Sequence, residues 1–209
     1  RTAHPVDKIF LGIIVGLTLA GFLIFISAAI GLMARDGMRF GAVVFNQFFF
    51  GLFLGGLGCF VSSRIPYRVW GNYAPHLFVV ALVLTALVFV PSLGVEHSGA
   101  RRWLAVGPLS LQPVEFLKLT FVMLLAAWFT LFRKKVHTFP AGLLPLATPL
   151  FAAGVLLILQ PNTSSLIIMA VTGTAMYLVA GARAKHLAAV CLVALAVLTA
   201  LVATKPYLR

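Results

Sequence analysis

The chain has 209 residues, of which 62% are hydrophobic and only 10% are charged, and its mean hydropathy is +1.09. Soluble domains carry about a quarter charged residues, so this chain has too few charges to cover a water-exposed surface of its size. Its net charge of +12 does not indicate nucleic-acid binding, because the basic residues lie in short gaps between apolar segments and form no stripe on a soluble scaffold. These values predict an all-α, polytopic integral membrane helix bundle.

Apolar segments bounded by charged or turn-forming residues predict about seven membrane-crossing helices, since one crossing needs about 20 apolar residues. Residues 138–182 hold no charge and are too long for one crossing, so Gln160-Pro161-Asn162 is expected to divide them. We expect a single transmembrane domain over 1–209, with a trimmed N-terminus and the first span as a signal-anchor. The predicted spans are 9–34, 40–62, 75–94, 113–132, 141–160, 163–181 and 187–203.

The distribution of basic residues favours a cytoplasmic N-terminus. In that orientation nine of the 16 basic residues lie on inner segments, six lie on outer segments and Lys118 lies within a span. The segment 95–112, expected to be a polar loop, the start of the fourth span and the turn at 160–164 then share the outer side. The residues expected to converge there on one outward-facing cavity are Arg101, Arg102, Trp103, Gln112, Glu115, Lys118, Gln160 and Asn162.

Glu115 and Lys118 are charged residues near the start of an apolar span. Their i, i+3 spacing places them on one face of a helix, and Pro113 suits the first turn of that helix. A charge facing lipid at this depth costs about 2–3 kcal/mol, so both side chains are expected to face protein or a water-filled cavity. The alternative is a local ion pair that reaches the interface and contacts no ligand.

Two further motifs each allow a functional and a structural interpretation. Arg101 and Arg102 could bind a diphosphate through bidentate contacts, with Trp103 packing on a lipid tail or a sugar. Alternatively, the three residues anchor the chain at the headgroups. In the Gln160-Pro161-Asn162 turn, Pro161 would end one helix and Asn162, Thr163 or Ser164 would cap the next, and capping alone explains the turn adequately.

No other residues form a catalytic or metal-binding pattern. Cys59 and Cys191 lie in apolar segments and are expected to be small core residues, and the five His are scattered without ligand spacing. The sequence contains no Ser-His-Asp set and no Gly-rich phosphate loop. The residues alone therefore predict a polar, mostly basic cavity suited to an anionic amphiphile.

At these residues the chain resembles the FtsW/RodA/SpoVE (SEDS) family of bacterial cell division and elongation. Residues 99–118, GARRWLAVGPLSLQPVEFLK, are similar to the family's block Gly-Ala-x-Arg-Trp … Gly-Pro … Gln-Pro-Ser-Glu-Phe-x-Lys. The Gln160-Pro161-Asn162 turn and the later Ala180-Gly181-Ala182 resemble a second block. Asp7-Lys8 before the first span and Ile26-Ser27-Ala28-Ala29 near its end are also similar.

The resemblance implies a ten-helix fold, of which this chain would cover about the first seven helices. It implies a peptidoglycan glycosyltransferase that polymerises lipid II at the outer face of the bacterial cytoplasmic membrane. Its partners would be a class B penicillin-binding transpeptidase, other divisome proteins and membrane lipids, with no nucleic acid. No tightly bound cofactor is implied, and the resemblance leaves open whether a divalent cation is required. Glu115 and Lys118 would support catalysis, and the substrate would be bound by Arg101, Arg102, Trp103, Gln112, Gln160 and Asn162.

Two positions depart from the family pattern. Val114 replaces the usual Ser, and Asn162 replaces the usual Asp, so only hydrogen bonding remains at that position. The family's main catalytic Asp follows the seventh helix, so it would lie beyond Arg209, and this chain alone is expected to be inactive. Transport of lipid II and a non-catalytic scaffold for the transpeptidase are the alternative functions. The residues favour the division type over the elongation type and do not define the oligomeric state.

Overall fold

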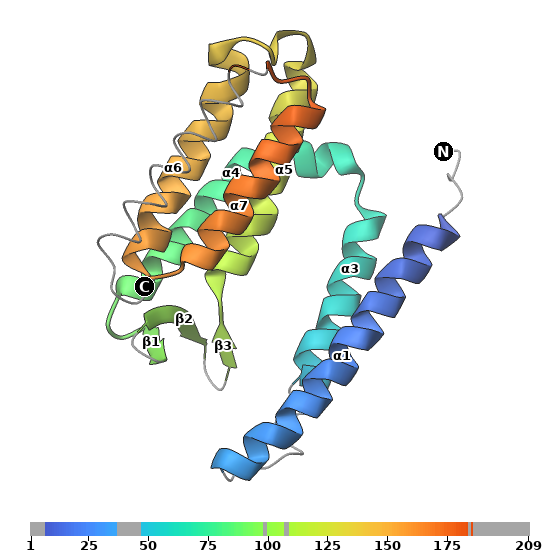
Figure 1. Ribbon diagram of the computed structural model, residues 1–209, viewed down its shortest axis with the longest axis vertical. Coiled ribbons are helices and arrows are strands. Elements are labelled where there is room, and N and C mark those ends of the chain that lie inside the picture. The colour runs from blue at the N-terminus through green and yellow to red at the C-terminus, as the bar shows by residue number, and fades with distance from the viewer. Residues whose placement is uncertain (1–6, 37–46, 98–99, 107–108, 184, 186–209) are drawn as a thin grey trace. The chain divides into compact units, whose positions relative to one another are not determined.

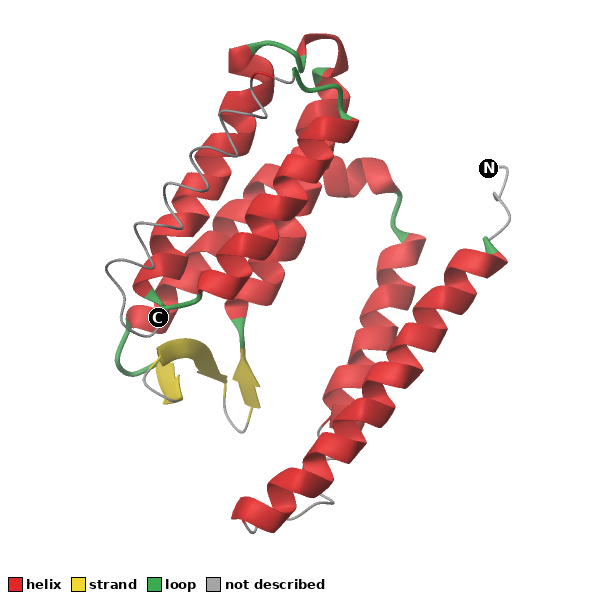
Figure 2. Cartoon of the chain, viewed as in Figure 1, coloured by secondary structure: helices red, strands yellow, loops and turns green. Residues whose placement is uncertain are grey.

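The computed structural model describes residues 7–36, 47–97, 100–106, 109–183 and 185 (Figures 1 and 2). The chain divides into two compact units, Arg1–Ile65 and Pro66–Arg209, which we describe separately. The single transmembrane domain over 1–209 stays a prediction. The seventh predicted span, 187–203, lies outside the described residues.

The first unit consists of apolar helices. Helix α1 begins directly after Asp7, whose Oδ1 accepts hydrogen bonds of 3.0 Å from the amides of Ile9 and Phe10. Most large apolar side chains described on these helices are exposed, as expected for surfaces that face lipid. The elements are α1 (Lys8–Asp36), the π-helical η1 (Gln47–Phe53) and α3 (Leu54–Arg64).

The second unit is a helix bundle with a small β-sheet at one end (Figure 1). Helices α4 and α5 run antiparallel, since a Cβ at Gly71, near the start of α4, would lie 3.9 Å from Ala127, near the end of α5. The helices are α4 (Tyr67–Ala86), η2 (Leu87–Phe89), α5 (Pro113–Leu131), η3 (Arg133–Lys135), η4 (Phe139–Leu143), α6 (Leu144–Leu159) and α7 (Thr163–Val179).

The core of the bundle lies between α5, α6 and α7. Phe121 is fully buried, and its ring lies 6.4 Å from that of Phe78 on α4. A Cβ at Gly173 would lie 2.7 Å from Leu146 Cδ1 and 3.0 Å from Phe121 Cζ, so only glycine allows α7 to approach this closely. The core is therefore continuous across all four long helices of this unit.

The structure confirms a polytopic helical membrane bundle. Four described helices are long and apolar enough to cross a membrane, and α7 is a shorter apolar helix. The bounds predicted for the third span, 75–94, are wrong: the helix starts at Tyr67 and ends at Phe89. The helix continues through Pro75, which lies after its first two turns, so this proline does not mark its start. Pro66, directly before Tyr67, does. The four candidate spans are Lys8–Ala28, Tyr67–Phe89, Pro113–Leu131 and Phe139–Leu159.

The segment between α4 and α5, expected to be a polar loop, forms a three-stranded antiparallel sheet of order β1-β2-β3 (Figure 2). Val95 pairs with Trp103, and Leu104 pairs with Leu111. Strand β3 leads through Gln112 directly into α5, so the sheet and the first turn of α5 are positioned together. The strands are β1 (Gly94–His97), β2 (Ala100–Val106) and β3 (Leu109–Leu111).

Candidate functional site

The bundle of α4–α7 has two polar ends with different side chains. We call one the sheet end: it comprises residues 87–118, with the sheet and the first turn of α5, and residues 159–165, with the α6–α7 turn. The opposite end, which we call the basic end, comprises residues 66–71, 131–143 and 179–185. All the predicted site residues lie at the sheet end.

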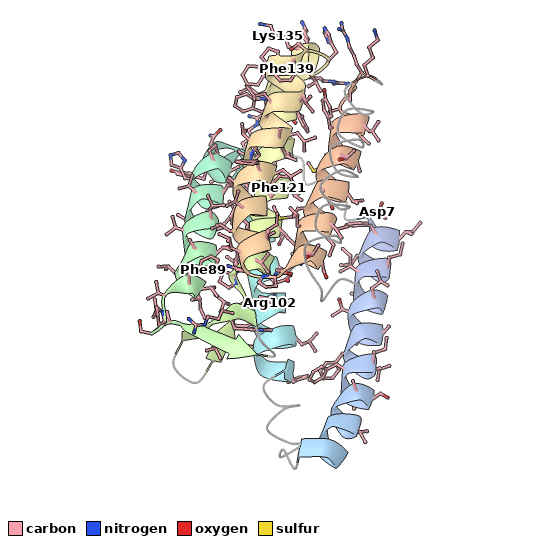
Figure 3. The ribbon with its side chains drawn as sticks, turned by 60° about the vertical axis from the view of Figure 1, so that its left-hand side comes forward. Asp7, Phe89, Arg102, Phe121, Lys135 and Phe139 are labelled. Carbon is pink, nitrogen blue, oxygen red and sulfur yellow. The ribbon has the colours of Figure 1, made fainter. Side chains whose placement is uncertain are left out.

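Side chains seen in Figure 3 make the division visible. Arg102 and Phe89 lie at the sheet end, Lys135 and Phe139 lie at the basic end, and Phe121 lies in the core between them. The 95–112 segment and the 160–164 turn, which the sequence placed on one side, thus share one end of the bundle. Residues far apart in sequence are brought together there.

Arg102 on β2 connects the sheet to the α6–α7 turn. Its Nε donates to the carbonyl of Gln160 at 3.4 Å, and its Nη2 donates to the carbonyl of Pro161. These carbonyls lie at the C-terminal end of α6, where the helix leaves acceptors without intrahelical partners and favours a cation. Arg102 therefore binds backbone carbonyls of the protein, a contact that the diphosphate interpretation did not predict.

Gln160 joins the same turn to the end of α4. Its side chain is 2% exposed, and its Nε2 donates to the carbonyl of Thr85 at 2.7 Å. Thr85 is fully buried near the C-terminal end of α4. Sequence analysis did not single out Thr85, because a Thr within an apolar span carries no signal that its carbonyl receives a distant side chain.

Asn162 occupies the N-cap position of α7, but its side chain makes no capping hydrogen bond, contrary to the capping interpretation. The residue is 5% exposed, and its Nδ2 has no hydrogen-bond partner within the described part of the chain. Its backbone amide donates to the carbonyl of Leu157 at 2.8 Å.

Glu115 and Lys118 form the ion pair that their spacing predicted. Lys118 Nζ lies 2.9 Å from Glu115 Oε2. The Lys118 side chain is 24% exposed and that of Glu115 is 58% exposed, so the lysine is the more shielded partner. Glu115 lies in the first turn of α5, where the helix dipole favours an anion.

Three other predicted residues lie near this pair along the chain. Arg101 is exposed and stands opposite Glu96 in the β1–β2 register, while Trp103 is half-buried on the same strand. Gln112 is half-buried at the N-cap position of α5 and makes no side-chain cap. All three are thus held on the sheet or at its junction with α5.

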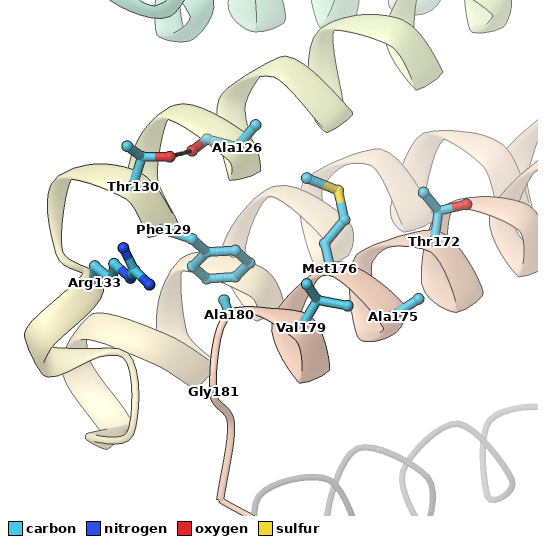
Figure 4. Close-up of a pocket in the computed structure, with 10 residues that line it drawn as sticks. All are labelled: Ala126, Phe129, Thr130, Arg133, Thr172, Ala175, Met176, Val179, Ala180 and Gly181. Atoms are coloured by element: carbon cyan, nitrogen blue, oxygen red, sulfur yellow. Dashed lines mark hydrogen bonds between the residues drawn. The ribbon is translucent and has the colours of Figure 1, made fainter. Parts of the chain in front are cut away.

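The cavity expected among these residues stays a prediction. The structure instead shows an open groove of about 860 Å³ at the basic end, between α5 and α7 (Figure 4). Within the described ranges, no three His, Cys, Asp or Glu side chains are grouped so that they could hold a metal ion. The sheet end presents the guanidinium groups of Arg101 and Arg102, the Glu115–Lys118 pair and the buried amides of Gln160 and Asn162.

Comparisons with known proteins place the chain in a family. The sequence model of the FtsW/RodA/SpoVE cell cycle proteins matches residues 8–209. The probable peptidoglycan glycosyltransferase FtsW of Nitrosococcus halophilus is 34% identical over 209 residues, covering 99% of this chain and 52% of the relative. The chain spans 32% to 51% of the length of the first curated relatives it matches.

Solved structures agree with this assignment. A chain from a peptidoglycan synthase complex, described as coordinating polymerization and crosslinking, superposes with a TM-score of 0.71 at 26% identity. That match covers 100% of this chain and 58% of the other. The rod shape determining protein RodA of Thermus thermophilus superposes with a TM-score of 0.60 at 27% identity, covering 85% of this chain and 58% of RodA.

Fold and composition together define a multi-pass helical membrane protein. Within that class, the chain belongs to the FtsW/RodA/SpoVE (SEDS) family. The family predicted from residues 99–118 is thereby confirmed, and the relatives named FtsW that match 99% of the chain support the division type.

Proposed function

We propose that this chain is part of a peptidoglycan glycosyltransferase that polymerises lipid II during bacterial cell division. The observation that carries this proposal is the match over 99% of the chain to a relative named as a probable peptidoglycan glycosyltransferase. The chain sits in the bacterial cytoplasmic membrane with its N-terminus in the cytoplasm and its sheet end at the outer face. A lipid-linked diphosphate at that face would meet the charges of the sheet end.

The charged residues of the sheet end have different roles in this proposal. Arg101 and Lys118 attract the diphosphate, and Glu115 holds the Lys118 ammonium in place through the 2.9 Å contact. Arg102 contributes a positive charge from a position fixed by the Gln160 and Pro161 carbonyls. Fixed charges of this kind stabilise negative charge that develops during reaction without having to reorganise.

The uncharged predicted residues support binding. Trp103 offers an aromatic surface for a sugar or lipid tail, and Gln112 and Asn162 supply amide hydrogen bonds. The Gln160 side chain is occupied by Thr85, so in this proposal Gln160 shapes the turn on which the site is built. No tightly bound cofactor enters the proposal.

The proposed partner is a class B penicillin-binding transpeptidase within the divisome. The support is the resemblance to a chain from a peptidoglycan synthase complex, at a TM-score of 0.71. Pairing a polymerase with a transpeptidase would allow the new glycan strand to be crosslinked as it emerges. Membrane lipids cover the exposed apolar helix faces.

Polymerisation of labelled lipid II by the full-length protein together with its transpeptidase tests the function. Lys118→Ala is expected to lower the rate about 100-fold, because removing one preorganised electrostatic group from a site has effects of that order. Glu115→Ala is expected to lower it less, since the lysine charge remains. Lys134→Ala, which removes an exposed lysine at the basic end, is the matched control.

Wild-type rates for both sheet-end variants would contradict their roles in the reaction. A liposome assay for lipid II transport on the same preparations separates the enzyme from a transporter. Transport without polymerisation by the wild-type protein would replace the proposed function with the transporter.

A further inference from the structure

The groove at the basic end is formed by one face of each of two helices. From α5 and the turn after it come Ala126, Phe129 and Arg133, and from α7 come Ala175, Met176 and Val179 (Figure 4). Ala126, Phe129 and Arg133 are spaced by three and four residues, and Val179 follows Met176 by three residues and Ala175 by four, so each set forms one continuous stripe. The walls are mostly apolar, with Thr130 and Thr172 also in the lining, and Arg133 is the charged residue there.

The groove is accessible from the outside of the bundle and has the size of a ligand site. Its volume of about 860 Å³ is within the range of about 300–1,000 Å³ that is typical for such sites. Val179, in the lining of the groove, is 91% exposed, and Leu131, two residues before Arg133, is 76% exposed. Both side chains are apolar, so they can contact lipid chains in a membrane-spanning bundle.

The basic end carries positive charge without acidic residues to neutralise it. In residues 66–209 the only acidic residues are Glu96 and Glu115, and both belong to the sheet end. An anion that reaches the basic end therefore meets attraction and no repulsion from carboxylates of this unit. The described cations there are Arg68, Arg133, Lys134, Lys135, Arg183 and Lys185.

From these observations we propose that the groove binds one anionic phospholipid of the surrounding bilayer. Arg133 binds the headgroup phosphate, for which its guanidinium geometry is suited, and an acyl chain lies against Phe129 and Met176. A soluble anion would leave the apolar walls uncovered. The headgroup of a zwitterionic lipid carries a cationic group beside its phosphate. The surrounding lysines and arginines repel that group, so a zwitterionic lipid binds more weakly.

Charge also argues against one alternative occupant, the predicted span 187–203 of this chain. That segment contains no charged residue, so it could cover the apolar walls but could not neutralise the cations. An anionic phospholipid does both. The site lies at the end of the bundle opposite the residues proposed for polymerisation, so it can be tested without reference to the enzymatic activity.

The experiment measures lipids retained by the full-length protein. The protein is reconstituted into nanodiscs of equal parts phosphatidylglycerol and phosphatidylcholine, extracted in mild detergent and analysed by native mass spectrometry. The wild-type protein is expected to retain phosphatidylglycerol preferentially. Arg133→Gln is expected to lower that retention about fivefold, since one basic residue near an anionic surface contributes about 1 kcal/mol.

Two further variants separate the groove from general charge. Ala175→Trp fills the groove without changing charge and is expected to lower retention about as much; its Tm shows that the exposed site still folds. Lys8→Gln removes one positive charge from α1 and is expected to retain lipid like the wild-type protein. Equal loss in Lys8→Gln, retention unaffected by Ala175→Trp, or a wild-type protein that retains no phosphatidylglycerol would each overturn the proposal.

Discussion

The two ends of the α4–α7 bundle handle charge in opposite ways. At the sheet end, Lys118 pairs with Glu115 at 2.9 Å, and Arg102 donates to two backbone carbonyls of the α6–α7 turn. At the basic end, cations are gathered without any acidic residue of this unit. The Glu115 carboxylate and the backbone carbonyls of the α6–α7 turn therefore hold Lys118 and Arg102 in place, whereas charge at the basic end has to be neutralised from outside this unit, for example by lipid headgroups or ions.

Backbone hydrogen bonds close the C-terminal end of α7, which lies at the basic end. After α7, the amide of Ala182 donates to the carbonyl of Tyr177 at 3.1 Å and that of Gly181 donates to Leu178 at 3.0 Å. With φ of +102° at Gly181, this is a Schellman motif, and it accounts for the Ala180-Gly181-Ala182 sequence. The end of α7 is therefore capped by its own backbone, and the charge of the basic end comes from its side chains.

Gly142→Val is expected to have the largest effect on stability. It tests whether the basic end is tightly packed beneath its charges. A Cβ at Gly142 would lie 1.9 Å from the backbone oxygen of Val136 and 2.8 Å from the Tyr177 ring. The backbone cannot yield cheaply, so we expect a loss of about 3 kcal/mol or more and little folded protein in detergent. Size-exclusion profiles and Tm measure this.

Gly71→Ala is the matched control for that change. The added Cβ would lie 3.9 Å from the Cβ of Ala127, which is an ordinary contact. We expect a Tm close to that of the wild-type protein. If Gly142→Val behaved like Gly71→Ala, the basic end would be loosely packed, and the two ends would differ in packing as well as in charge.

Gln160→Leu is expected to have the next largest effect, and it tests the directional bonds of the sheet end. The leucine removes the 2.7 Å hydrogen bond to the buried Thr85 carbonyl, which leaves that acceptor without its side-chain donor. An unsatisfied buried acceptor costs about 1–3 kcal/mol, which should appear as a lower Tm.

Thr85→Val provides the comparison for Gln160→Leu. It removes only the 2.7 Å bond from Thr85 Oγ1 to the Ala81 carbonyl and retains the backbone carbonyl that Gln160 binds. Its Tm should fall less than that of Gln160→Leu. The opposite order would show that the Gln160 contact contributes little to holding the sheet end together.

Arg102→Lys is expected to have a smaller effect, of about 1 kcal/mol. An ammonium cannot reproduce the two-donor contact with the Gln160 and Pro161 carbonyls, although it retains the charge near the end of α6. Faster amide hydrogen exchange in the α6–α7 turn is the expected signature. In Arg133→Lys, an exposed arginine at the opposite end changes in the same way, and exchange in that turn should stay at the wild-type rate.

The sequence predicted the features that depend on local patterns. Apolar segments revealed the helices, the uncharged stretch divided by Gln160-Pro161-Asn162 separated α6 from α7, and i, i+3 spacing paired Glu115 with Lys118. The gathering of the 95–112 segment and the 160–164 turn followed from the parity of crossings. Each of these inferences needs only hydropathy, charge and spacing.

Features that depend on tertiary contacts were missed. Short strands such as β3, Leu109–Leu111, carry no signal apart from their pairing with a neighbour, so the sheet was expected to be a loop. The hydrogen bond from Gln160 to Thr85 joins positions 75 residues apart. The groove requires α5 and α7 to be adjacent, which the order of spans does not reveal. Sequence patterns thus identified the charged residues, whereas only the fold showed which groups they contact.

Glu115→Gln is expected to have the smallest effect on stability, and it separates the two interpretations of the Glu115–Lys118 pair. An exposed i, i+3 pair stabilises a helix by about 0.2–0.5 kcal/mol, and Glu115 is 58% exposed, so Tm should change little. At high salt, which screens the ion pair, the variant and the wild-type protein should have the same Tm. Polymerisation should nevertheless fall, because Lys118 loses the carboxylate that positions it. A Tm decrease of several degrees with unchanged polymerisation would instead mean that the pair stabilises the helix and has no part in the reaction.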